Sequence, residues 1–353
     1  MPSRRVALTY RSAGVDRGGK EAMLAALRPR IRLTHRKGVL GGGGEFGGLF
    51  RLHGFQDPIL VSSIDGVGTK TRVAAGAGRW RVIGRDIVAH GANDVLCHGA
   101  AALYMLDYIA AERLRREVVR KILSGIIAAC REETIALLGG ETAEMPGVYA
   151  PQEIDVVACV VGAVERSRLI TGRAIRPGDA IVGIASNGLH TNGYALARAV
   201  LLPAGHDGQA GIERAMRRVP RGLSEPLGEA LLRPHRPYSR PVLALYEHLA
   251  IHGIAHITGG GIPGNLIRIL PAGCRAVVVR GSWRVPPLFD LIQEHGKVAV
   301  GEMFRTFNMG LGLVLVVRGG DGRAAVTRLQ RLGERAWIVG RVVAGPRGVE
   351  IRA

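Results

Sequence analysis

Residues that could bind a metal-bound phosphate occur together in the motif DGVGTK, which spans residues 65–70. Asp65 directly follows a run of β-branched and aliphatic residues that predicts a buried strand over 59–64. Its carboxylate can bind Mg²⁺, the glycines let backbone amides approach a phosphate, and Lys70 can neutralise phosphate charge. The G-x-x-x-x-G-K-[ST] spacing of a P-loop is absent. A glycine-rich turn with a surface carboxylate explains this motif, taken alone, equally well.

Three oxygen-bearing side chains lie on a predicted helix over 80–96, in the motif GRDIVAHGAND. Asp86 and Asn93 are seven residues apart, which is about two helical turns, so both can project from one face. Together with Asp94 they lie among apolar residues, where such groups are costly unless they are solvated or bound to a cation. We therefore expect a Mg²⁺ site here, with a solvated helix face and a helix C-cap as the alternative.

Two further motifs follow predicted strands. GGETAEMPG places Glu141 at a strand end, where α/β sheets gather ligands, although Thr142 and Glu144 are equally compatible with a helix cap. SNGLHTNGYAL contains His190, a residue type that suits proton transfer near neutral pH, with a structural histidine in a loop as the alternative. The motifs HITGGGIPGN and FRTFNMGLG indicate further backbone-lined pockets, or else tight turns between strands.

Strands and helices alternate along the chain, which predicts an α/β protein with two or three layers. The predicted helices cover 21–32, 80–96 and 118–133, and the predicted strands cover 59–64, 102–110, 135–138, 154–164 and 180–186. A polar stretch over 166–179 ends in the turn-like RPGD and separates two halves of similar texture. We therefore expect a first domain over 1–168, a second over 169–345 and a tail over 346–353.

Composition excludes several classes of protein. Of the 353 residues, 47% are hydrophobic and 22% charged, which is enough for one large domain or two ordinary ones and is unlike a disordered chain. The net charge is +19, but only five of the 48 basic residues are lysines and the arginines are scattered. This pattern does not favour nucleic-acid binding, although a positive field attracts phosphorylated small molecules. The four cysteines lie far apart, which indicates reduced thiols and no zinc site.

No apolar run approaches the roughly 20 residues of a membrane-spanning helix. The first residues lack the apolar core of a signal peptide. We therefore expect a cytoplasmic protein that does not bind membranes.

In combination, the motifs identify a family. The chain resembles the phosphoribosylformylglycinamidine cyclo-ligases (aminoimidazole ribonucleotide synthetases) from about Tyr10 to about Gly340, almost its whole length. The motifs that carry the likeness are SSIDGVGTK, GRDIVAHGAND, GGETAEMPG, SNGLHTNGYAL, RPHRPY, HITGGGIPGN and FRTFNMGLG. DGVGTK alone is shared with a wider superfamily, whereas its combination with GGETAEMPG and RTFN is specific.

The resemblance implies a fold and a reaction. The fold has two α/β domains: an N-terminal ATP-binding domain whose sheets pair across a homodimer to form a barrel, and a C-terminal domain with a mixed sheet and helices that completes the active site. The reaction is the ATP-dependent closure of formylglycinamidine ribonucleotide to aminoimidazole ribonucleotide in purine synthesis, with release of ADP and phosphate. ATP would convert the formyl amide oxygen to an iminophosphate, and the amidine nitrogen would then expel phosphate.

The resemblance also implies roles for individual residues. Asp94, Lys70 and His190 would act in catalysis, with His190 a candidate for proton transfer. The implied Mg²⁺ ligands are Asp65, Asp94 and Glu141, with Asp86 and Asn93 as orienting groups. The implied phosphate-holding residues are Gly66, Gly68, Thr69 and Lys70. The implied substrate contacts are His190, Thr191 and Asn192, and the implied mobile cover is the loop 41–48 with Gly42, Gly43 and Gly44.

Three residues depart from the family pattern. Ala101 and Gly264 stand where relatives often have Glu, and Arg28 stands where relatives can carry a nucleotide-contacting Lys. None of them belongs to the DGVGTK, AND or GGET groups, so they bear on rate or specificity more than on the class of reaction. Arg keeps the charge of Lys but not its compact ammonium geometry.

Other ATP-using enzymes of the superfamily are the nearest alternatives. Selenophosphate synthetase should carry a reactive Cys in its early glycine-rich loop, and the hydrogenase-maturation relative should end in one. Neither feature occurs here. Thiamine-monophosphate kinase lacks the combination of GGETAEMPG and RTFN, and the amidotransferase-dependent synthetase is much longer. A non-catalytic paralogue or a basic RNA-binding scaffold is the alternative from another class.

Overall fold

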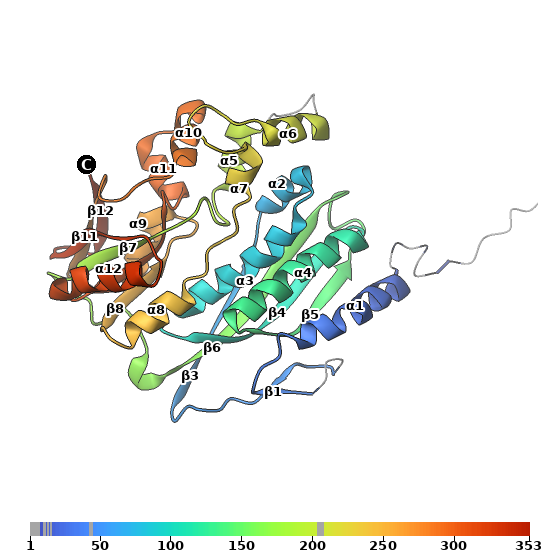
Figure 1. The fold of residues 1–353 in the computed structure, drawn as a ribbon, viewed down its shortest axis with the longest axis horizontal. Helices are drawn as coiled ribbons and strands as arrows, with labels where there is room; N and C mark the ends of the chain where they lie inside the picture. Colours follow the sequence, from blue (N-terminus) through green and yellow to red (C-terminus); the bar gives the residue numbers. More distant parts are fainter. Residues whose placement is uncertain (1–7, 10–11, 13, 15, 42–44, 203–207) are drawn as a thin grey trace, which may run out of the picture.

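The computed structural model describes residues 8–9, 12, 14, 16–41, 45–202 and 208–353 of the chain. The expected cover-loop residues Gly42, Gly43 and Gly44 lie outside the described residues. Within the described part the chain forms two α/β units, each with its own sheet (Figure 1).

The N-terminal unit is built on a four-stranded sheet with the order β3-β6-β4-β5. β4 and β5 pair in parallel, and the other neighbours are antiparallel. The strands are β1 (Val39–Leu40), β2 (Leu49–Phe50), β3 (Pro58–Gly66), β4 (Ala101–Ala111), β5 (Ala136–Glu144) and β6 (Ile154–Glu165), of which β1 and β2 form a separate hairpin. The helices are α1 (Arg17–Arg32), α2 (Lys70–Ala77), α3 (Trp80–Leu96) and α4 (Arg116–Glu133). The helices and strands predicted for this half are confirmed, with ends that differ by up to six residues. β5 continues to Glu144, so the prediction that Glu141 lies at the end of its strand is wrong.

Two glycines allow the central helices α3 and α4 to pack closely. A Cβ atom at Gly84 of α3 would overlap the Ile122 carbonyl oxygen of α4, and one at Gly125 of α4 would overlap the Arg81 carbonyl oxygen of α3. Both helices lie on the same face of the sheet (Figure 1). This close packing fixes the position of α3, which carries Asp86, Asn93 and Asp94.

The other face of the four-stranded sheet has large apolar side chains in contact with solvent. Leu60 and Ile64 of β3 are 61% and 70% exposed, and Leu106 of β4 is 38% exposed. Side chains alternate between the two faces of a strand, so these residues point away from α3 and α4. Contiguous apolar surface of this kind is typical of an interaction site.

The C-terminal unit contains a mixed six-stranded sheet with the order β12-β9-β11-β7-β10-β8, as expected. Its strands are β7 (Ala180–Ala185), β8 (Ile251–His256), β9 (Cys274–Val279), β10 (Leu311–Val317), β11 (Ala336–Ala344) and β12 (Gly348–Arg352). Its helices are α5 (Tyr194–Leu201), α6 (Gly208–Arg217), α7 (Leu227–Leu231), α8 (Ser239–Tyr246), α9 (Gly261–Leu266), α10 (Pro287–Gly296), α11 (Val300–Thr306) and α12 (Gly322–Arg331), and the 3₁₀ helices are η1 (Arg166–Arg168), η2 (Ile267–Ile269) and η3 (Gly319–Asp321).

The prediction that residues 346–353 form a separate tail is wrong. Residues 348–352 form β12, which pairs in parallel with β9, because their backbone groups complete the edge of the sheet. The connection between the two sheets runs over 166–179 and includes η1. No helix among the described residues is long and apolar enough to cross a membrane. The cytoplasmic location stays a prediction.

Candidate functional site

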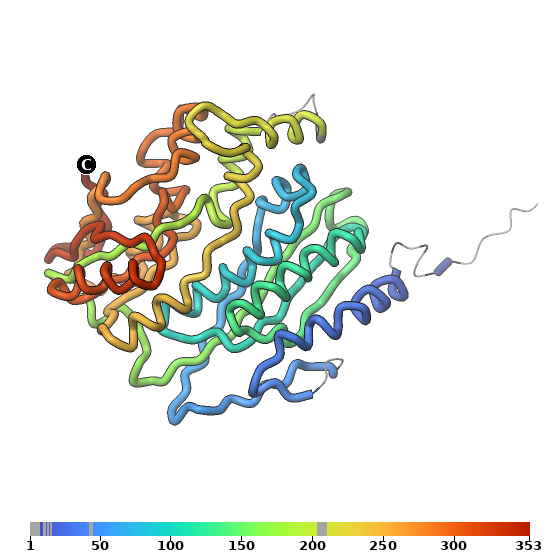
Figure 2. Tube along the Cα trace, viewed as in Figure 1, coloured from blue at the N-terminus to red at the C-terminus, as the bar shows by residue number. Residues whose placement is uncertain are grey.

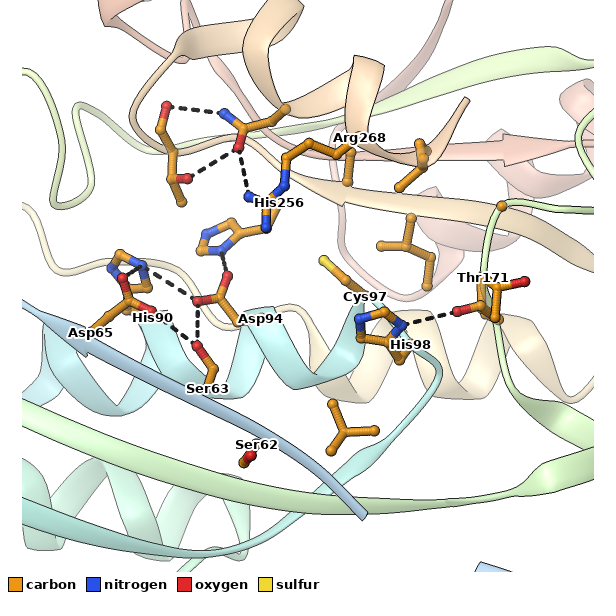
Figure 3. Close-up of a pocket in the computed structure, with 18 residues that line it drawn as sticks. Ser62, Ser63, Asp65, His90, Asp94, Cys97, His98, Thr171, His256 and Arg268 are labelled. Carbon is orange, nitrogen blue, oxygen red and sulfur yellow. Dashed lines mark hydrogen bonds and ion pairs between the residues drawn. The ribbon is translucent and has the colours of Figure 1, made fainter. Parts of the chain in front are cut away.

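A cavity of about 410 Å³ lies between the two units, and the carboxylates of Asp65 and Asp94 line it (Figure 3). Asp65 comes from the end of β3 and Asp94 from the last turn of α3. The Ser63 hydroxyl lies between them, 2.9 Å from Asp65 Oδ2 and 3.0 Å from Asp94 Oδ2. The structure therefore brings together two of the three residues predicted to bind metal.

The two carboxylates have different proton affinities. Burial, followed by the hydrogen bond and the charge of Asp94, raises the pKa of Asp65 to about 6. Burial alone would also raise the pKa of Asp94, but the hydrogen bond and charge of His256 hold it below its usual range. Two carboxylates held this close, one of which is costly to ionise, are a suitable site for a divalent cation, whose charge offsets their repulsion. The residues present therefore fit Mg²⁺.

Histidines surround this carboxylate pair. His256 Nδ1 lies 2.8 Å from Asp94 Oδ1, and His256 Nε2 lies 3.0 Å from His235 Nε2. His90 Nδ1 lies 2.8 Å from the Thr191 hydroxyl, which is also 3.2 Å from His235 Nδ1. The result is a continuous polar network that joins α3, the end of β8 and two loops of the C-terminal unit.

His190 lies at the back of this network in an unusual conformation. Its backbone φ is +62°, which is a left-handed value that non-glycine residues seldom adopt. Its ring stacks on His235 with 4.1 Å between centroids, and both ring nitrogens are buried without a hydrogen-bond partner among the described residues. Burial, together with nearby positive charge, holds the pKa of His190 well below its usual value. The ring is therefore neutral at pH 7, and burial makes it a weak base.

Lys70 does not lie in the Asp65 cavity, which corrects its expected role as a phosphate ligand. Its ammonium is fully buried, 2.7 Å from Asp86 Oδ2, and donates to the carbonyl oxygens of His190 and Arg233 at 2.9 Å each. Three oxygen acceptors therefore occupy its three donors. The side chain turns inward because α2 begins against the C-terminal unit, where these three oxygen atoms stabilise the ammonium charge.

Asp86 and Asn93 lie on one side of α3, as their spacing indicated, and both bind the segment 233–238. This segment runs alongside α3 (Figure 2). Asp86 Oδ1 accepts from the His235 amide at 2.7 Å. Asn93 Oδ1 accepts from the Tyr238 amide at 2.9 Å, and its Nδ2 donates to the Arg236 carbonyl at 2.9 Å. These buried contacts hold the C-terminal unit on α3.

Glu141 lies apart from the other two residues predicted to bind metal. Cross-strand pairing aligns Asp65 with Ala158, Asp107 and Gly140, which puts Glu141 on the opposite face of the sheet. β5 is also three strands away from β3, about 14 Å at the usual strand spacing. Glu141 is 62% exposed and pairs with Lys20 at 3.2 Å. Within one chain it therefore cannot share a cation with Asp65 and Asp94.

The other predicted residues lie at various distances from this cavity. Gly68 and Thr69 line a second cavity of about 890 Å³, on the other side of the turn after β3. Thr191 is buried in the histidine network, and Asn192 donates to its hydroxyl at 3.3 Å. The three residues that depart from the family pattern are exposed and do not line the first cavity: Arg28, Ala101 and Gly264.

Sequence reasoning missed several residues of the site. Ser63, His90, His235 and His256 lie inside motifs already singled out, so the histidines that recur in these motifs were an available signal. Asp107, a buried carboxylate that does not line this cavity, had no such signal. It lies on the helix-facing side of β4, and burial raises its pKa to about 7.

Comparison with known proteins identifies the family. Residues 48–164 match the family described as AIR synthase related protein, N-terminal domain, and residues 176–352 match the corresponding C-terminal domain. A phosphoribosylformylglycinamidine cyclo-ligase of Myxococcus xanthus (strain DK1622) is 49% identical over 339 residues, which cover 96% of each chain. This chain belongs to the phosphoribosylformylglycinamidine cyclo-ligase family. A cyclo-ligase of Symbiobacterium thermophilum is 46% identical over 97% of this chain and 98% of its own.

Solved structures with lower identity share the cyclo-ligase fold. The hydrogenase maturation protein HypE in complex with ATP has a TM-score of 0.66 and 18% identity, covering 94% of this chain and 90% of its own. Thiamine-monophosphate kinase from Stenotrophomonas maltophilia K279a has a TM-score of 0.62 and 18% identity, covering 92% of this chain and 95% of its own. At 18% identity these structures show a shared fold only. The cyclo-ligase sequences, which match over almost the whole chain, show the family.

Proposed function

We propose that this cyclo-ligase homologue catalyses the ATP-dependent closure of formylglycinamidine ribonucleotide to aminoimidazole ribonucleotide, with release of ADP and phosphate. The observation that carries the proposal is the Asp65–Asp94 pair in a cavity between the two units, in a chain 49% identical to a cyclo-ligase. The cavity has room for a small phosphorylated substrate, and the paired carboxylates suit the cation that accompanies ATP.

The chemistry follows from the leaving group. The formyl oxygen leaves poorly as hydroxide, so transfer of the γ-phosphoryl group from ATP converts it to an iminophosphate. The amidine nitrogen then attacks the same carbon, the C–N bond closes the ring, and the C–O bond breaks to release phosphate. Such a sequence depends on alignment and on neutralisation of charge more than on a protein nucleophile.

Asp65 and Asp94 would hold Mg²⁺, which would neutralise phosphate charge as the phosphoryl group moves. Ser63 orients both carboxylates through its hydroxyl, and His256 keeps Asp94 ionised. His190, whose buried ring nitrogens have no hydrogen-bond partner among the described residues, would be the candidate for moving the proton lost by the attacking nitrogen. Thr191 and Asn192 would orient the substrate beside it.

A homodimer would account for two features of the single chain. The exposed apolar residues Leu60, Ile64 and Leu106 would be covered if two such sheet faces packed together. Glu141, an exposed carboxylate on that same face, would then lie at the interface. We expect Ile64→Glu to convert a dimer into a monomer in sedimentation velocity. A monomeric wild-type protein would contradict this assembly.

The reaction is tested by measuring ADP release from purified protein with ATP and Mg²⁺, with and without formylglycinamidine ribonucleotide. ADP release that depends on the substrate and is matched one-for-one by aminoimidazole product supports the proposal. Asp94→Asn should lower turnover at least about 100-fold, equivalent to about 2.7 kcal/mol. ADP release without aminoimidazole would instead indicate another phosphoryl acceptor.

A further inference from the structure

The Asp65 cavity carries charges of opposite sign on its two walls. Asp65 and Asp94 belong to the wall formed by the N-terminal unit. The wall formed by the C-terminal unit contains Arg268, which is the only Lys or Arg among the described residues that line this cavity (Figure 3). A ligand that fits both walls therefore needs one group attracted to the carboxylates and one attracted to a guanidinium.

Arg268 has a fixed location but no charged partner. It lies in η2, directly after α9, and its guanidinium makes one hydrogen bond, 3.4 Å to Asn265 Oδ1. Among the described residues no carboxylate lies within ion-pair distance of it. Its positive charge therefore remains available to a ligand in the cavity.

Asn265 is built to hold this arginine in place. It is 3% exposed, and its Nδ2 donates to the carbonyl oxygens of Thr258, Gly259 and Gly261 at 3.3, 3.1 and 2.8 Å. These three contacts fix which way the amide faces and point Oδ1, an acceptor, toward the Thr258 hydroxyl and Arg268. The Thr258 hydroxyl and Arg268 both donate to it. The glycine-rich turn thus positions a guanidinium over the cavity.

We propose, on the basis of the function proposed above, that Arg268 anchors the 5′-phosphate of the ribonucleotide substrate. Guanidinium binds phosphate through paired N–H···O bonds, whereas the two carboxylates repel a phosphate that has no cation. The substrate would therefore lie with its phosphate against Arg268 and its formyl and amidine groups toward Asp94 and His256. The phosphates of ATP, which travel with Mg²⁺, belong at the carboxylate wall.

The proposal is tested by steady-state kinetics of Arg268→Gln. KM for formylglycinamidine ribonucleotide should rise about 10- to 100-fold, as expected when a charged hydrogen bond is lost, while kcat and KM for ATP stay within about twofold. Formylglycinamidine riboside, which lacks the phosphate, should give the same kcat/KM with variant and wild type. Arg323→Gln, an exposed change on α12, is the matched control and should leave all constants unchanged.

Two other outcomes would overturn the proposal. A rise in KM for ATP and not for the ribonucleotide would assign Arg268 to the nucleotide. If Arg268→Gln lowered kcat/KM for the riboside as much as for the ribonucleotide, Arg268 would have a structural role and would not bind the phosphate.

Direct binding of ribose 5-phosphate, measured by calorimetry, separates this inference from the proposed reaction. If the protein binds ribose 5-phosphate through Arg268 but has no cyclisation activity, the phosphate-binding role of Arg268 is supported and the proposed reaction is contradicted. If the wild-type protein and Arg268→Gln bind ribose 5-phosphate with equal affinity, Arg268 is not the phosphate-binding residue, whether or not the protein catalyses the cyclisation.

Discussion

Lys70 and Asp86 form a fully buried ion pair within the N-terminal unit, where it contacts the C-terminal unit, with 2.7 Å between Nζ and Oδ2. Lys70 also holds the His190 carbonyl, and Asp86 also holds the His235 amide. Burial lowers the pKa of Lys70 and raises that of Asp86, while the ion pair opposes both shifts. The pair thus fixes two histidines of the site from behind and does not touch the cavity.

Replacing Lys70 by Met is expected to destabilise the protein by about 3–5 kcal/mol, because it leaves the Asp86 carboxylate buried without a partner. Chemical denaturation measures this change. Lys121→Met, on the exposed side of α4, is the control and should change stability by less than about 0.5 kcal/mol. If Lys70→Met kept its stability but raised KM for ATP, the residue would be a phosphate ligand after all.

His190→Asn is expected to leave the fold intact and to lower turnover by about 100-fold or more, as when a group that transfers a proton is removed. Asn tolerates the left-handed backbone that His190 adopts, so the change removes the imidazole without adding strain. Melting temperature and kcat are measured together. Full activity in a variant with an unchanged melting temperature would exclude His190 from the chemistry.

Binding of Mg²⁺ should strengthen as pH rises through about 6, the pKa of Asp65. Below that pH a proton on the carboxylate pair competes with the cation, and above it the ionised pair attracts the cation. Without Mg²⁺, a rise in pH lowers the stability of the folded protein. The pKa of Asp65 in the folded state exceeds the unfolded value of 3.8, so stability falls as pH rises from about 4 to above 6.

The increase in melting temperature caused by Mg²⁺ should therefore be larger at pH 7.5 than at pH 5. Asp65→Asn serves as the comparison and should abolish the difference. An equal effect of Mg²⁺ at both pH values in the wild-type protein would place the cation elsewhere.

Asp107→Asn should stabilise the protein above pH 7. Burial raises the pKa of Asp107 to about 7 from 3.8, so the folded state keeps a proton that the unfolded state loses. The contribution of Asp107 to stability is therefore lost as pH rises from about 4 to about 7, by up to about 4 kcal/mol at 1.36 kcal/mol per pKa unit. Thermal melting of both proteins at pH 4 and pH 8 measures the effect. A less stable variant at pH 8 would show that the ionised carboxylate has a favourable partner.

Much of the local structure could be predicted from the sequence. Apolar runs located the four strands of the N-terminal sheet and β7 of the C-terminal sheet. The seven-residue spacing of Asp86 and Asn93 put both on one side of α3, where they bind the segment 233–238. Motif order alone indicated the family. These features depend on neighbours in the chain, because helix and strand periods are local properties.

Only the tertiary structure decided which of these side chains meet. Asp65 and Glu141 each follow an apolar run that predicts a strand, yet the pairing of β4 with β5 and β6 puts them on opposite faces of the sheet. The register between strands depends on residues far apart in the chain. Lys70 follows the glycines of its motif but turns inward, because oxygen atoms of residues 86, 190 and 233 surround its ammonium. His235 and His256 enter the site only when the C-terminal unit packs on α3. A sequence motif determines which groups are available, whereas the packing of distant segments determines their distances.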